Sequence, residues 1–243
     1  MRYSRSKYVK HRVMEKSASL SAHLPETHRF KRKYFESLLD KYDQAIVKPV
    51  GGWGGDGVIS VSSGADGKCK VHYGQKRKTF DDADDAYAYV RKLTKGRKCI
   101  VQRKITLATV GGRPFDLRVM VQRKKGDSTW KVTGKLAKVA GAGYVITNVR
   151  RSHGKVISFE EAVRRSNIRG PSIRELEERI DDVALAATKK LKKYYRIRMC
   201  GMDIGLDDAG KVWIIEPNFT PYLGMFLKLK DRSIYRRIIA YTR

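Results

Sequence analysis

The chain has 243 residues, of which 41% are hydrophobic and 32% are charged. This apolar content is too high for a disordered chain, and the length suits one large domain or two small ones around a buried core. Lys and Arg outnumber Asp and Glu by 53 to 25, and the net charge of +28 predicts an anionic partner: nucleic acid, an anionic membrane or polymer, an acidic polypeptide, or nucleotide phosphate.

The cysteines and the N-terminus exclude several further classes. Three cysteines without CxxC spacing or a nearby His pair argue against a disulfide framework and against a zinc site. No apolar window reaches the length of a signal peptide or of a transmembrane helix. We therefore expect a soluble cytoplasmic protein in a reducing setting.

Helical spacing marks the first part of the sequence, where LPET (24–27) separates an early helix from a second one over FKRKYFESLLDKY (30–42). The pattern then changes to strands, because AIVKPV (45–50) and VISVSS (58–63) flank the glycine-rich loop GGWGGDG (51–57) like a hairpin. KCKVHYGQKRKTF (68–80) predicts a further strand. DDADDAYAYVRKL (81–93) follows as a helix whose acidic start and basic end suit the helix dipole.

Strands dominate from Cys99 to Asn148, where an antiparallel meander is predicted over CIVQRKI (99–105), FDLRVMVQRK (115–124), WKVTGKLAKVA (130–140) and YVITNV (144–149). The clearest helix covers residues 172–195, where Ser172 and Glu175 form a capping-box pattern ahead of one apolar stripe. CGMDIGLDDAGKVWIIEPNF (200–219) predicts two strands joined by a DDAG turn, and a short basic helix follows. This order predicts an α+β fold and disfavours a Rossmann sheet.

The glycine loop is a candidate phosphate-binding site, since five glycines in seven positions let backbone N–H groups approach an anion closely. Lys48, on the strand that enters the loop, can bring an ammonium group to phosphates held under it. A Walker A motif places its lysine after the glycines, and the HRD and DFG motifs of protein kinases do not occur in this sequence. A flexible hairpin tip is the alternative interpretation of the glycines alone.

Glu216 and Asn218 are two residues apart, so in a strand both side chains point to the same face and can share one ion. A carboxylate with an amide oxygen suits Mg²⁺, which takes one or two protein carboxylates together with substrate phosphates. Asp203, on the preceding strand of the predicted hairpin, can complete this site. The alternative is a solvated strand end at which Pro217 stops the sheet.

Asp116 and Arg118 form a second same-face pair, on the strand FDLRVMVQ and opposite its apolar face. One interpretation is a structural ion pair. In the other, Arg118 binds a carboxylate with two hydrogen bonds or stabilises a developing oxyanion. The sequence leaves both interpretations open.

These segments resemble the ATP-grasp superfamily in order as well as in type: a Lys-Pro strand entering a glycine loop, a strand FDLR, an Asp, and a final Glu-x-Asn followed by Pro. The chain looks most like the YheC/YheD-type spore-coat-associated proteins, through SKYVKHRVM, LPET, KPVGGWGGDGV, RPFDLRVMVQ, VTG, ITNV and GMDIGLDDAGKVWIIEPNFTP. The resemblance implies two α+β subdomains that clamp ATP between antiparallel sheets. We expect residues 45–105 to form the subdomain with the glycine loop, and residues 1–44 and 106–243 to form the remainder with the metal site.

The resemblance also implies roles for individual residues. Lys48 matches a lysine that contacts nucleotide phosphates, and Lys7 on the first helix is the candidate for an earlier one. The residues implied to bind magnesium are Asp203, Glu216 and Asn218. The glycines implied to cover the nucleotide are Gly51, Gly52, Gly54, Gly55 and Gly57.

The remaining implied contacts concern the adenine base and the reacting groups. The segment from Val101 to Ile105, including Gln102, falls where the hinge of the family pairs with the adenine edge. Lys138 and Asn148 fall near positions that face the triphosphate. Lys48 and Arg118 are the residues expected to take part in catalysis.

Two departures from the family pattern affect the expected substrate. The hinge reads Gln102-Arg103, where many members have Gln followed by Glu. ATP-grasp enzymes usually carry an N-terminal domain that helps to bind the acceptor, and here only six residues precede Lys7. We therefore expect another surface or a partner protein to recognise the acceptor.

The implied activity is an ATP- and Mg²⁺-dependent carboxylate–amine ligase that works through an acylphosphate on an acidic peptide, protein or other anionic acceptor. The alternative is an altered ATP-grasp scaffold that binds nucleic acid or another anionic polymer through KRK (76–78), RK with KGRK (91–98) and KKLKKYYRIR (189–198). Each of these clusters alone also fits a solvated charged face. The oligomeric state stays open.

Overall fold

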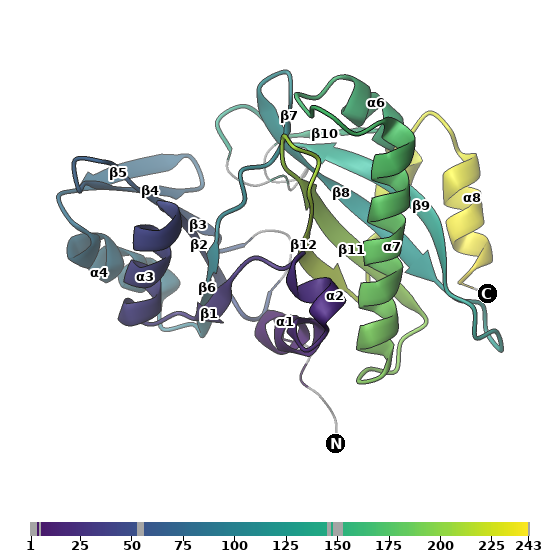
Figure 1. Ribbon diagram of the computed structural model, residues 1–243, viewed down its shortest axis with the longest axis horizontal. Coiled ribbons are helices and arrows are strands. Elements are labelled where there is room, and N and C mark those ends of the chain that lie inside the picture. Colours follow the sequence, from purple (N-terminus) through teal and green to yellow (C-terminus); the bar gives the residue numbers. More distant parts are fainter. Residues whose placement is uncertain (1–3, 5, 53–55, 145–146, 148–152, 243) are drawn as a thin grey trace.

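A computed structural model covers the whole chain and describes all residues except 1–3, 5, 53–55, 145–146, 148–152 and 243. The described residues form two lobes side by side, each built on an antiparallel sheet with helices packed against it (Figure 1). We call residues 27–103 the glycine-loop lobe, and residues 6–24 with 109–242 the carboxylate lobe. None of the helices in the described part of the chain is both long and apolar enough to cross a membrane.

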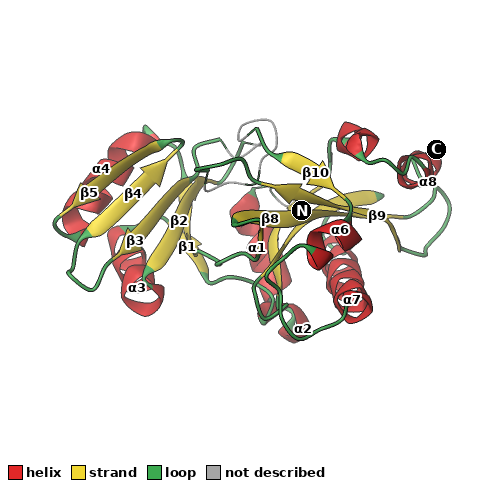
Figure 2. Ribbon diagram, turned by 90° about the horizontal axis from the view of Figure 1, so that it is seen from above, coloured by secondary structure: helices red, strands yellow, loops and turns green. Residues whose placement is uncertain are grey.

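The glycine-loop lobe has a six-stranded sheet in the order β1-β6-β2-β3-β4-β5. Its two helices cover one face of the sheet, where alternate strand residues such as Val47 and Val61 meet Phe35 and Val90 in one core (Figure 2). The elements are β1 (Thr27–Arg29), α3 (Arg32–Tyr42), β2 (Gln44–Pro49), β3 (Ile59–Ser63), β4 (Cys69–Tyr73), β5 (Lys76–Phe80), α4 (Ala83–Thr94) and β6 (Cys99–Arg103).

The carboxylate lobe has a sheet in the order β10-β9-β8-β11-β12, with β7 paired to β8. The larger core lies between one face of this sheet and helices α1, α2, α6 and α7, whereas η1 and α8 cover part of the other face around Met120 and Phe226. The elements are α1 (Lys7–Glu15), α2 (Ala18–Ser21), β7 (Thr109–Val110), β8 (Arg113–Gln122), β9 (Lys131–Val139), β10 (Lys155–Ile157), α6 (Phe159–Arg164), α7 (Ile173–Lys192), β11 (Met199–Leu206), β12 (Val212–Asn218), the 3-10 helix η1 (Leu223–Lys228) and α8 (Ser233–Ala240).

Several predicted elements are confirmed. The strands on either side of the glycine loop pair as β2 and β3, and the DDAG turn joins the antiparallel strands β11 and β12. Helix α7 begins with the predicted capping box, because the backbone N of Glu175 donates to Ser172 Oγ (3.2 Å) and the backbone N of Ser172 donates to Glu175 Oε2 (2.7 Å).

The predicted meander over 99–148 is wrong in its first strand, because β6 pairs with β1 and β2 in the other sheet. A strand pattern indicates which side chains are buried but does not identify the partner strand. The sequence therefore could not predict that these strands belong to two different sheets. KCKVHYGQKRKTF forms two strands, β4 and β5. YVITNV lies mostly outside the described residues, and its described residues Tyr144 and Thr147 are not in a strand.

The glycine-loop sheet takes in elements that precede its expected start at residue 45. β1 pairs with β6, and α3 contributes Phe35, Leu38 and Leu39 to the core of this lobe. Between the lobes, the backbone N of Arg103 donates to Glu26 O (2.9 Å) and that of Lys104 donates to Gln44 O (3.3 Å). The chain therefore crosses between the lobes at both ends of this unit.

Candidate functional site

Lys48 lies on β2 and points to the sheet face opposite the helices, because Ala45 and Val47 fill the core on the other face. Its buried side chain lines a cleft between the lobes together with Lys7 and Glu216. Burial is the main cause that lowers the pKa of Lys48, to about 8. Among the described residues no carboxylate forms an ion pair with Lys48, so its ammonium group can accept an anion that enters this cleft.

Lys7, the first residue of α1, connects the glycine loop with the C-terminal carboxylate. Its Nζ donates a hydrogen bond to Gly52 O (2.8 Å) and lies 3.1 Å from Glu216 Oε1. Its backbone N donates to Val50 O (2.9 Å), which fixes the start of α1 against the strand that enters the loop. Lys7, Lys48, Gly52 and Glu216 therefore meet at one point between the lobes.

Lys10 lies one helical turn after Lys7 and was missed by the sequence reasoning. Its Nζ donates to the carbonyl oxygen of Pro217 and lies 3.7 Å from Glu216 Oε1. Burial lowers the pKa of Lys10, while Glu216 raises it. The spacing of three residues, which places both lysines on one helix face, was the signal that could have found it.

The glycine loop is described at Gly51, Gly52 and Gly57, whereas Gly54 and Gly55 lie outside the described residues. Gly52 and Gly57 have φ values of +88° and +69°, which favour glycine. A Cβ on Gly57 would lie 2.8 Å from Arg97 Nη2 and 2.9 Å from Pro49 Cγ. This end of the loop therefore needs glycine for its backbone angle and for its packing.

A buried charged cluster surrounds Asp203 on the sheet face that points away from the large core. Arg118 donates from Nε to Asp203 Oδ1 (2.9 Å) and from Nη2 to Asp203 Oδ2 (3.2 Å). Lys138 Nζ lies 2.9 Å from Asp203 Oδ1 and 3.0 Å from Asp116 Oδ1. Strand register explains the pairs, because Arg118 is opposite Asp203 and Lys138 is opposite Asp116.

The predicted ion pair between Asp116 and Arg118 is therefore not formed among the described residues, although both side chains share one face. Cross-strand neighbours are closer than residues two apart on one strand, and each group pairs across the sheet. Thr147, which the sequence reasoning also missed, donates from Oγ1 to Asp116 Oδ2. Asn148 lies outside the described residues.

The charges in this cluster shift one another's pKa values. Burial raises the pKa of Asp203, but the Arg118 guanidinium and the Lys138 ammonium lower it further, to about 2. Burial raises the pKa of Asp116, with Lys138 acting in the opposite direction. Although burial lowers it, the two carboxylates raise the pKa of Lys138. Asp203 is consequently a carboxylate at neutral pH.

The three candidate metal ligands lie on the paired strands β11 and β12. Asp203 is directly opposite Glu216, and Asn218 is opposite Gly201, with a register shift after Asp203. Asn218 Oδ1 accepts a hydrogen bond from the backbone N of Thr220 (2.9 Å). Two carboxylates and an amide oxygen are donors that fit Mg²⁺, and their cross-strand opposition fits a shared ion. In the described structure protein cations hold both carboxylates: Lys7 and Lys10 hold Glu216, and Arg118 and Lys138 hold Asp203.

The described residues contain no group of three or more His, Cys, Asp and Glu side chains that could hold a metal ion. The candidate set contains two such residues, and its third member is an amide. A magnesium site here would therefore need substrate phosphate oxygens and water to complete the coordination.

Residues of the expected adenine hinge line two different pockets at the lobe junction. The buried side chain of Gln102 donates from Nε2 to Thr27 Oγ1 (2.6 Å) and lines the cleft with Lys48. Ile105 lines a second, more open pocket at the junction. The other residues around this second pocket are Tyr42, Gln44, Arg103, Lys104, Thr106, Asp207, Asp208 and Trp213.

Arg103 occupies part of this junction pocket through aromatic contacts. Its guanidinium carbon lies 4.5 Å from the ring centre of Tyr42 and 5.1 Å from that of Trp213. The departure from the family's hinge pattern therefore places a cation between one ring from each lobe.

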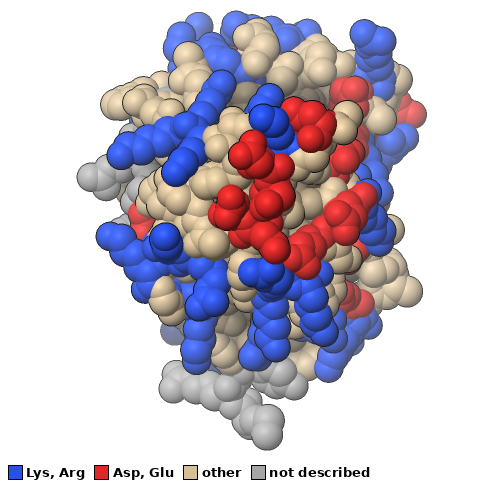
Figure 3. Space-filling view, turned by 90° about the vertical axis from the view of Figure 1, so that its left-hand side faces the viewer, with Lys and Arg blue, Asp and Glu red and all other residues tan. Residues whose placement is uncertain are grey.

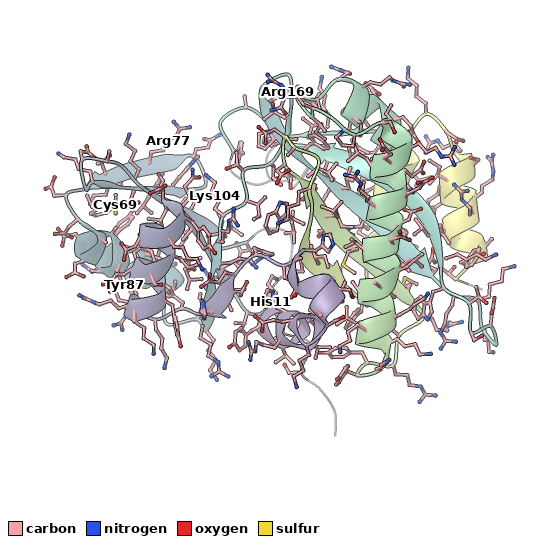
Figure 4. All side chains as sticks on the ribbon, viewed as in Figure 1. His11, Cys69, Arg77, Tyr87, Lys104 and Arg169 are labelled. Atoms are coloured by element: carbon pink, nitrogen blue, oxygen red, sulfur yellow. The ribbon has the colours of Figure 1, made fainter. Side chains whose placement is uncertain are left out.

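His11 is a further buried group beside the Lys48 cleft. It lies on α1, where Figure 4 labels it at the junction of the lobes, and it lines the cleft with Lys48. Burial and then Lys48 lower the pKa of His11 to about 4. Sequence reasoning missed His11, which lies in the SKYVKHRVM segment but carries no chemistry-specific spacing.

Two lobes with antiparallel sheets, a glycine loop with entering lysine, and carboxylates on a final strand pair together define an ATP-grasp protein. The chain belongs to the YheC/D-like ATP-grasp family, whose family model matches residues 2–243. The resemblance and the α+β ATP-grasp fold predicted from the sequence are confirmed.

Two curated relatives come from Bacillus subtilis (strain 168). The chain is 26% identical over 230 residues to the endospore coat-associated protein YheD, covering 91% of this chain and 49% of that protein. It is 22% identical over 220 residues to the endospore coat-associated protein YheC, covering 86% of this chain and 57% of that protein. The chain thus spans about half the length of the curated relatives it matches.

Solved structures of ATP-grasp ligases share the fold at low sequence identity. The D-alanine–D-alanine ligase from Bacillus anthracis has a TM-score of 0.55 at 16% identity, over 98% of this chain and 66% of that one. The ATP-grasp ligase PsnB, in a complex with a precursor variant, Mg and ADP, has a TM-score of 0.54 at 15% identity, over 98% of this chain and 59% of that one. At this identity the similarity shows the fold.

Proposed function

We propose that this chain is an ATP- and Mg²⁺-dependent ligase that joins a carboxylate to an amine through an acylphosphate, with an anionic peptide, protein or other macromolecule as acceptor. The observation that carries the proposal is the position of Lys7. Its ammonium group contacts both the glycine loop at Gly52 and the carboxylate of Glu216, with Lys48 in the same cleft. A triphosphate needs cations and a metal carboxylate beside the loop that covers it, and this arrangement brings two lysines and Glu216 together at the glycine loop.

The nucleotide would lie between the two sheets, against the sheet face that carries Lys48 and the sheet face that carries Asp203. Lys48 and Lys7 would hold its phosphates under Gly51, Gly52, Gly54, Gly55 and Gly57. The base would reach the lobe junction, where the segment from Gln102 to Ile105 and the ring of Trp213 supply backbone groups and an apolar surface. Lys138 and Asn148 would face the triphosphate from the carboxylate lobe.

Mg²⁺ would be held by Asp203, Glu216 and Asn218, and would neutralise phosphate charge during transfer. The cations that now hold these carboxylates would change partners when the nucleotide binds. Lys7 would turn from Glu216 to a phosphate, whereas Lys10 would stay on the backbone carbonyl of Pro217 and keep β12 in place. The site would therefore exchange one set of ion pairs for another without leaving a buried charge uncompensated.

The proposed reaction has two balanced steps. A substrate carboxylate oxygen attacks the γ-phosphorus, the bond to the β,γ-bridging oxygen breaks, and ADP leaves with an acylphosphate formed. An amine then attacks the acyl carbon, phosphate leaves, and the amine loses a proton to give the amide. Arg118 points from β8 into this region and can bind the oxygens of the acylphosphate, since its donors already match a carboxylate.

The test is ADP formation from ATP with a panel of acidic peptides, in the presence and absence of hydroxylamine. The proposal expects peptide-dependent ADP release and a hydroxamate formed by capture of the acylphosphate. ADP release with free amino acids alone would rule out the macromolecular acceptor. Full ligation at saturating substrates in an Arg118→Ala protein would remove the role of Arg118.

A further inference from the structure

The outer three strands of the glycine-loop lobe, β3, β4 and β5, have two faces of opposite character. Their helix-facing side chains, such as Ile59, Val61 and Val71, are apolar and buried in the core. We call the other side the inner face. Its side chains are Ser60, Ser62, Lys70, His72, Arg77 and Thr79. This set contains three basic side chains and no carboxylate.

The inner face is continuous with the reaction cleft through strand register. One row of directly opposed residues runs across the sheet from Gln102 through Ile46, Ser60 and His72 to Arg77. At about 4.8 Å per strand, the row is about 19 Å long. Gln102 lines the Lys48 cleft at one end of the row, and Arg77 lies on the edge strand at the other.

The carboxylate lobe meets this sheet at the tip of the hairpin formed by β4 and β5. Gln75, in the turn between the two strands, donates from Nε2 to the hydroxyl oxygen of Tyr144 (3.0 Å). In Figure 4, Arg77 lies along the upper edge of the glycine-loop lobe and Lys104 lies between the lobes. The two lobes are therefore in contact at this end of the inner face, and Gln102 at the other end of the row lines the cleft.

One buried polar atom and two cations of the inner face are not paired within the described residues. His72 Nε2 is buried and has no hydrogen-bond partner among the described residues. In the same described set, no carboxylate forms an ion pair with Lys70, Arg77 or Lys104. Burial lowers the pKa of Lys104, and burial, Arg77 and Lys104 lower the pKa of His72. Cations without an ion-paired carboxylate, such as Lys70 and Arg77, can be compensated by an anion.

Acidic side chains of the glycine-loop lobe gather on its other side. Figure 3 shows a group of Asp and Glu residues on the outer surface of this lobe. Glu36 and Asp40 on α3 and Asp84 on α4 lie close enough together that burial and Asp84 raise the pKa of Glu36. The helical side thus mixes acidic and basic side chains, whereas the inner face has basic side chains and no carboxylate, which favours an acidic partner on the inner face.

The side chains of the inner face favour a peptide over a nucleic acid. Single-stranded nucleic acids bind mainly through Phe, Tyr and Trp rings that stack on bases, and the six inner-face side chains include none of these, His72 being their one aromatic ring. Hydroxyl, imidazole, ammonium and guanidinium donors suit carboxylates. We propose that the inner face binds a carboxylate-rich peptide segment of the acceptor and leads it from the β5 edge to the cleft. This inference rests on the proposed ligase function.

The experiment compares two double variants that remove the same charge from opposite faces of the same hairpin. Lys70→Gln/Arg77→Gln changes the inner face, and Lys76→Gln/Lys78→Gln changes the helix-facing side. A fluorescent eight-residue Glu-rich peptide is the probe, and its Gln counterpart is the peptide control. Binding is measured by fluorescence anisotropy in 0.1 M salt, where charges are screened over about 10 Å.

We expect the inner-face double variant to bind the Glu-rich peptide at least about fivefold more weakly, and the control double variant less than about twofold. Equal weakening in both variants would show that net charge alone attracts the peptide and would overturn the proposal. Absence of binding to the unmodified protein would also overturn it. A loss of oligothymidylate binding without a loss of peptide binding in the inner-face variant would assign the surface to nucleic acid instead.

Binding of ATP with Mg²⁺ is measured in the same proteins to separate the two proposals. We expect it to be unchanged in both double variants, because none of the four substituted side chains lines the Lys48 cleft. If the unmodified protein binds the peptide but not ATP, the proposed function fails and the peptide surface remains. If it binds ATP and both double variants bind the peptide equally, the peptide surface fails and the proposed function remains.

Discussion

Lys48 and Lys138 are buried lysines on the two sheets, and burial lowers the pKa of both, yet their net pKa shifts have opposite directions. In the glycine-loop lobe, Lys48 has no ion pair among the described residues and its pKa falls to about 8. In the carboxylate lobe, Lys138 lies 3.0 Å and 2.9 Å from Asp116 and Asp203, and its pKa is raised. The buried lysine on one side of the site is therefore ion-paired with carboxylates of the chain, and the buried lysine on the other side is not.

The difference distinguishes a buried cation that carboxylates of the folded chain compensate from a buried cation that a bound anion can compensate. A buried cation flanked by two carboxylates stabilises the folded chain, because removing it leaves buried negative charge. A buried cation without a counter-ion destabilises the ligand-free chain and gains most when an anion arrives. The contrast concerns the two lysines: carboxylates of the chain pair with Lys138, whereas none forms an ion pair with Lys48 among the described residues.

The largest effect is expected for Lys138→Met, which should lower the free energy of unfolding by about 3 kcal/mol at pH 7. The loss should grow as pH rises, because the folded variant keeps a proton on Asp116 that the unfolded chain has released. Urea unfolding at pH 6 and pH 8 measures both effects.

The control for this substitution is Lys135→Met on the same strand. Lys135 Nζ pairs with Glu177 (2.9 Å) and Asp181 (2.7 Å), whose side chains are 44% and 30% exposed, against 6% for Asp116. This variant should lose about 1 kcal/mol or less, since exposed carboxylates regain water. Equal losses in the two variants would contradict the assignment of Lys138 to a structural role.

Lys48→Met should weaken ATP–Mg²⁺ binding by about 3 kcal/mol, or more than 100-fold, without lowering stability. Its low pKa means that the unfolded chain binds more protons between pH 8 and 10.5, so the stability of the unmodified protein rises across that window. The variant should lack this rise. Calorimetric nucleotide binding and urea unfolding at pH 7.5 and 10 check the two parts, with the exposed Lys98→Met as the charge-matched control.

Local pattern was sufficient for much of the fold. The sequence predicted three elements correctly: the glycine loop between two strands, the capped helix α7 and the final hairpin. Turns, helix caps and strand alternation depend on residues that are close together in the sequence. The same-face argument for Glu216 and Asn218 needed only the period of a strand.

The parts that could not be predicted depend on contacts between distant segments. Strand β6 was assigned to a meander because its partners, β1 and β2, come from earlier in the chain. Asp116 and Arg118 were paired along one strand, whereas Asp203 and Lys138 arrive from neighbouring strands and take those partners. Lys10 reaches Pro217 from 207 residues away. A single sequence does not specify which strands become neighbours, so these charge pairs stayed hidden.

His11, which lines the cleft with Lys48, offers a measure of burial in this cleft that does not need a ligand. Its pKa of about 4 lies below the ordinary 6.5, so the unfolded chain binds more protons between these values. The contribution to stability is fully present above pH 6.5 and is lost as pH falls through about 4, to a total of up to about 3 kcal/mol. His11→Gln should flatten the pH dependence of unfolding between pH 6.5 and 4.5, and the exposed His153→Gln should retain it. A parallel slope in the His11 variant would show that other groups cause the acid loss.

The smallest effect concerns the two ends of the glycine loop. Gly52 and Gly57 both have positive φ, so an alanine at either position costs about 1 kcal/mol in backbone energy. A Cβ on Gly52 meets nothing within 4 Å, whereas one on Gly57 meets Arg97 and the ring of Pro49. Gly57→Ala should therefore lose about 1 kcal/mol more stability than Gly52→Ala, measured by urea unfolding. Because Pro49 follows Lys48 directly, Gly57→Ala should also displace that lysine and weaken ATP binding more than Gly52→Ala does. Equal stability in the two variants would mean that Arg97 moves aside freely and that Gly57 does not hold the base of the loop.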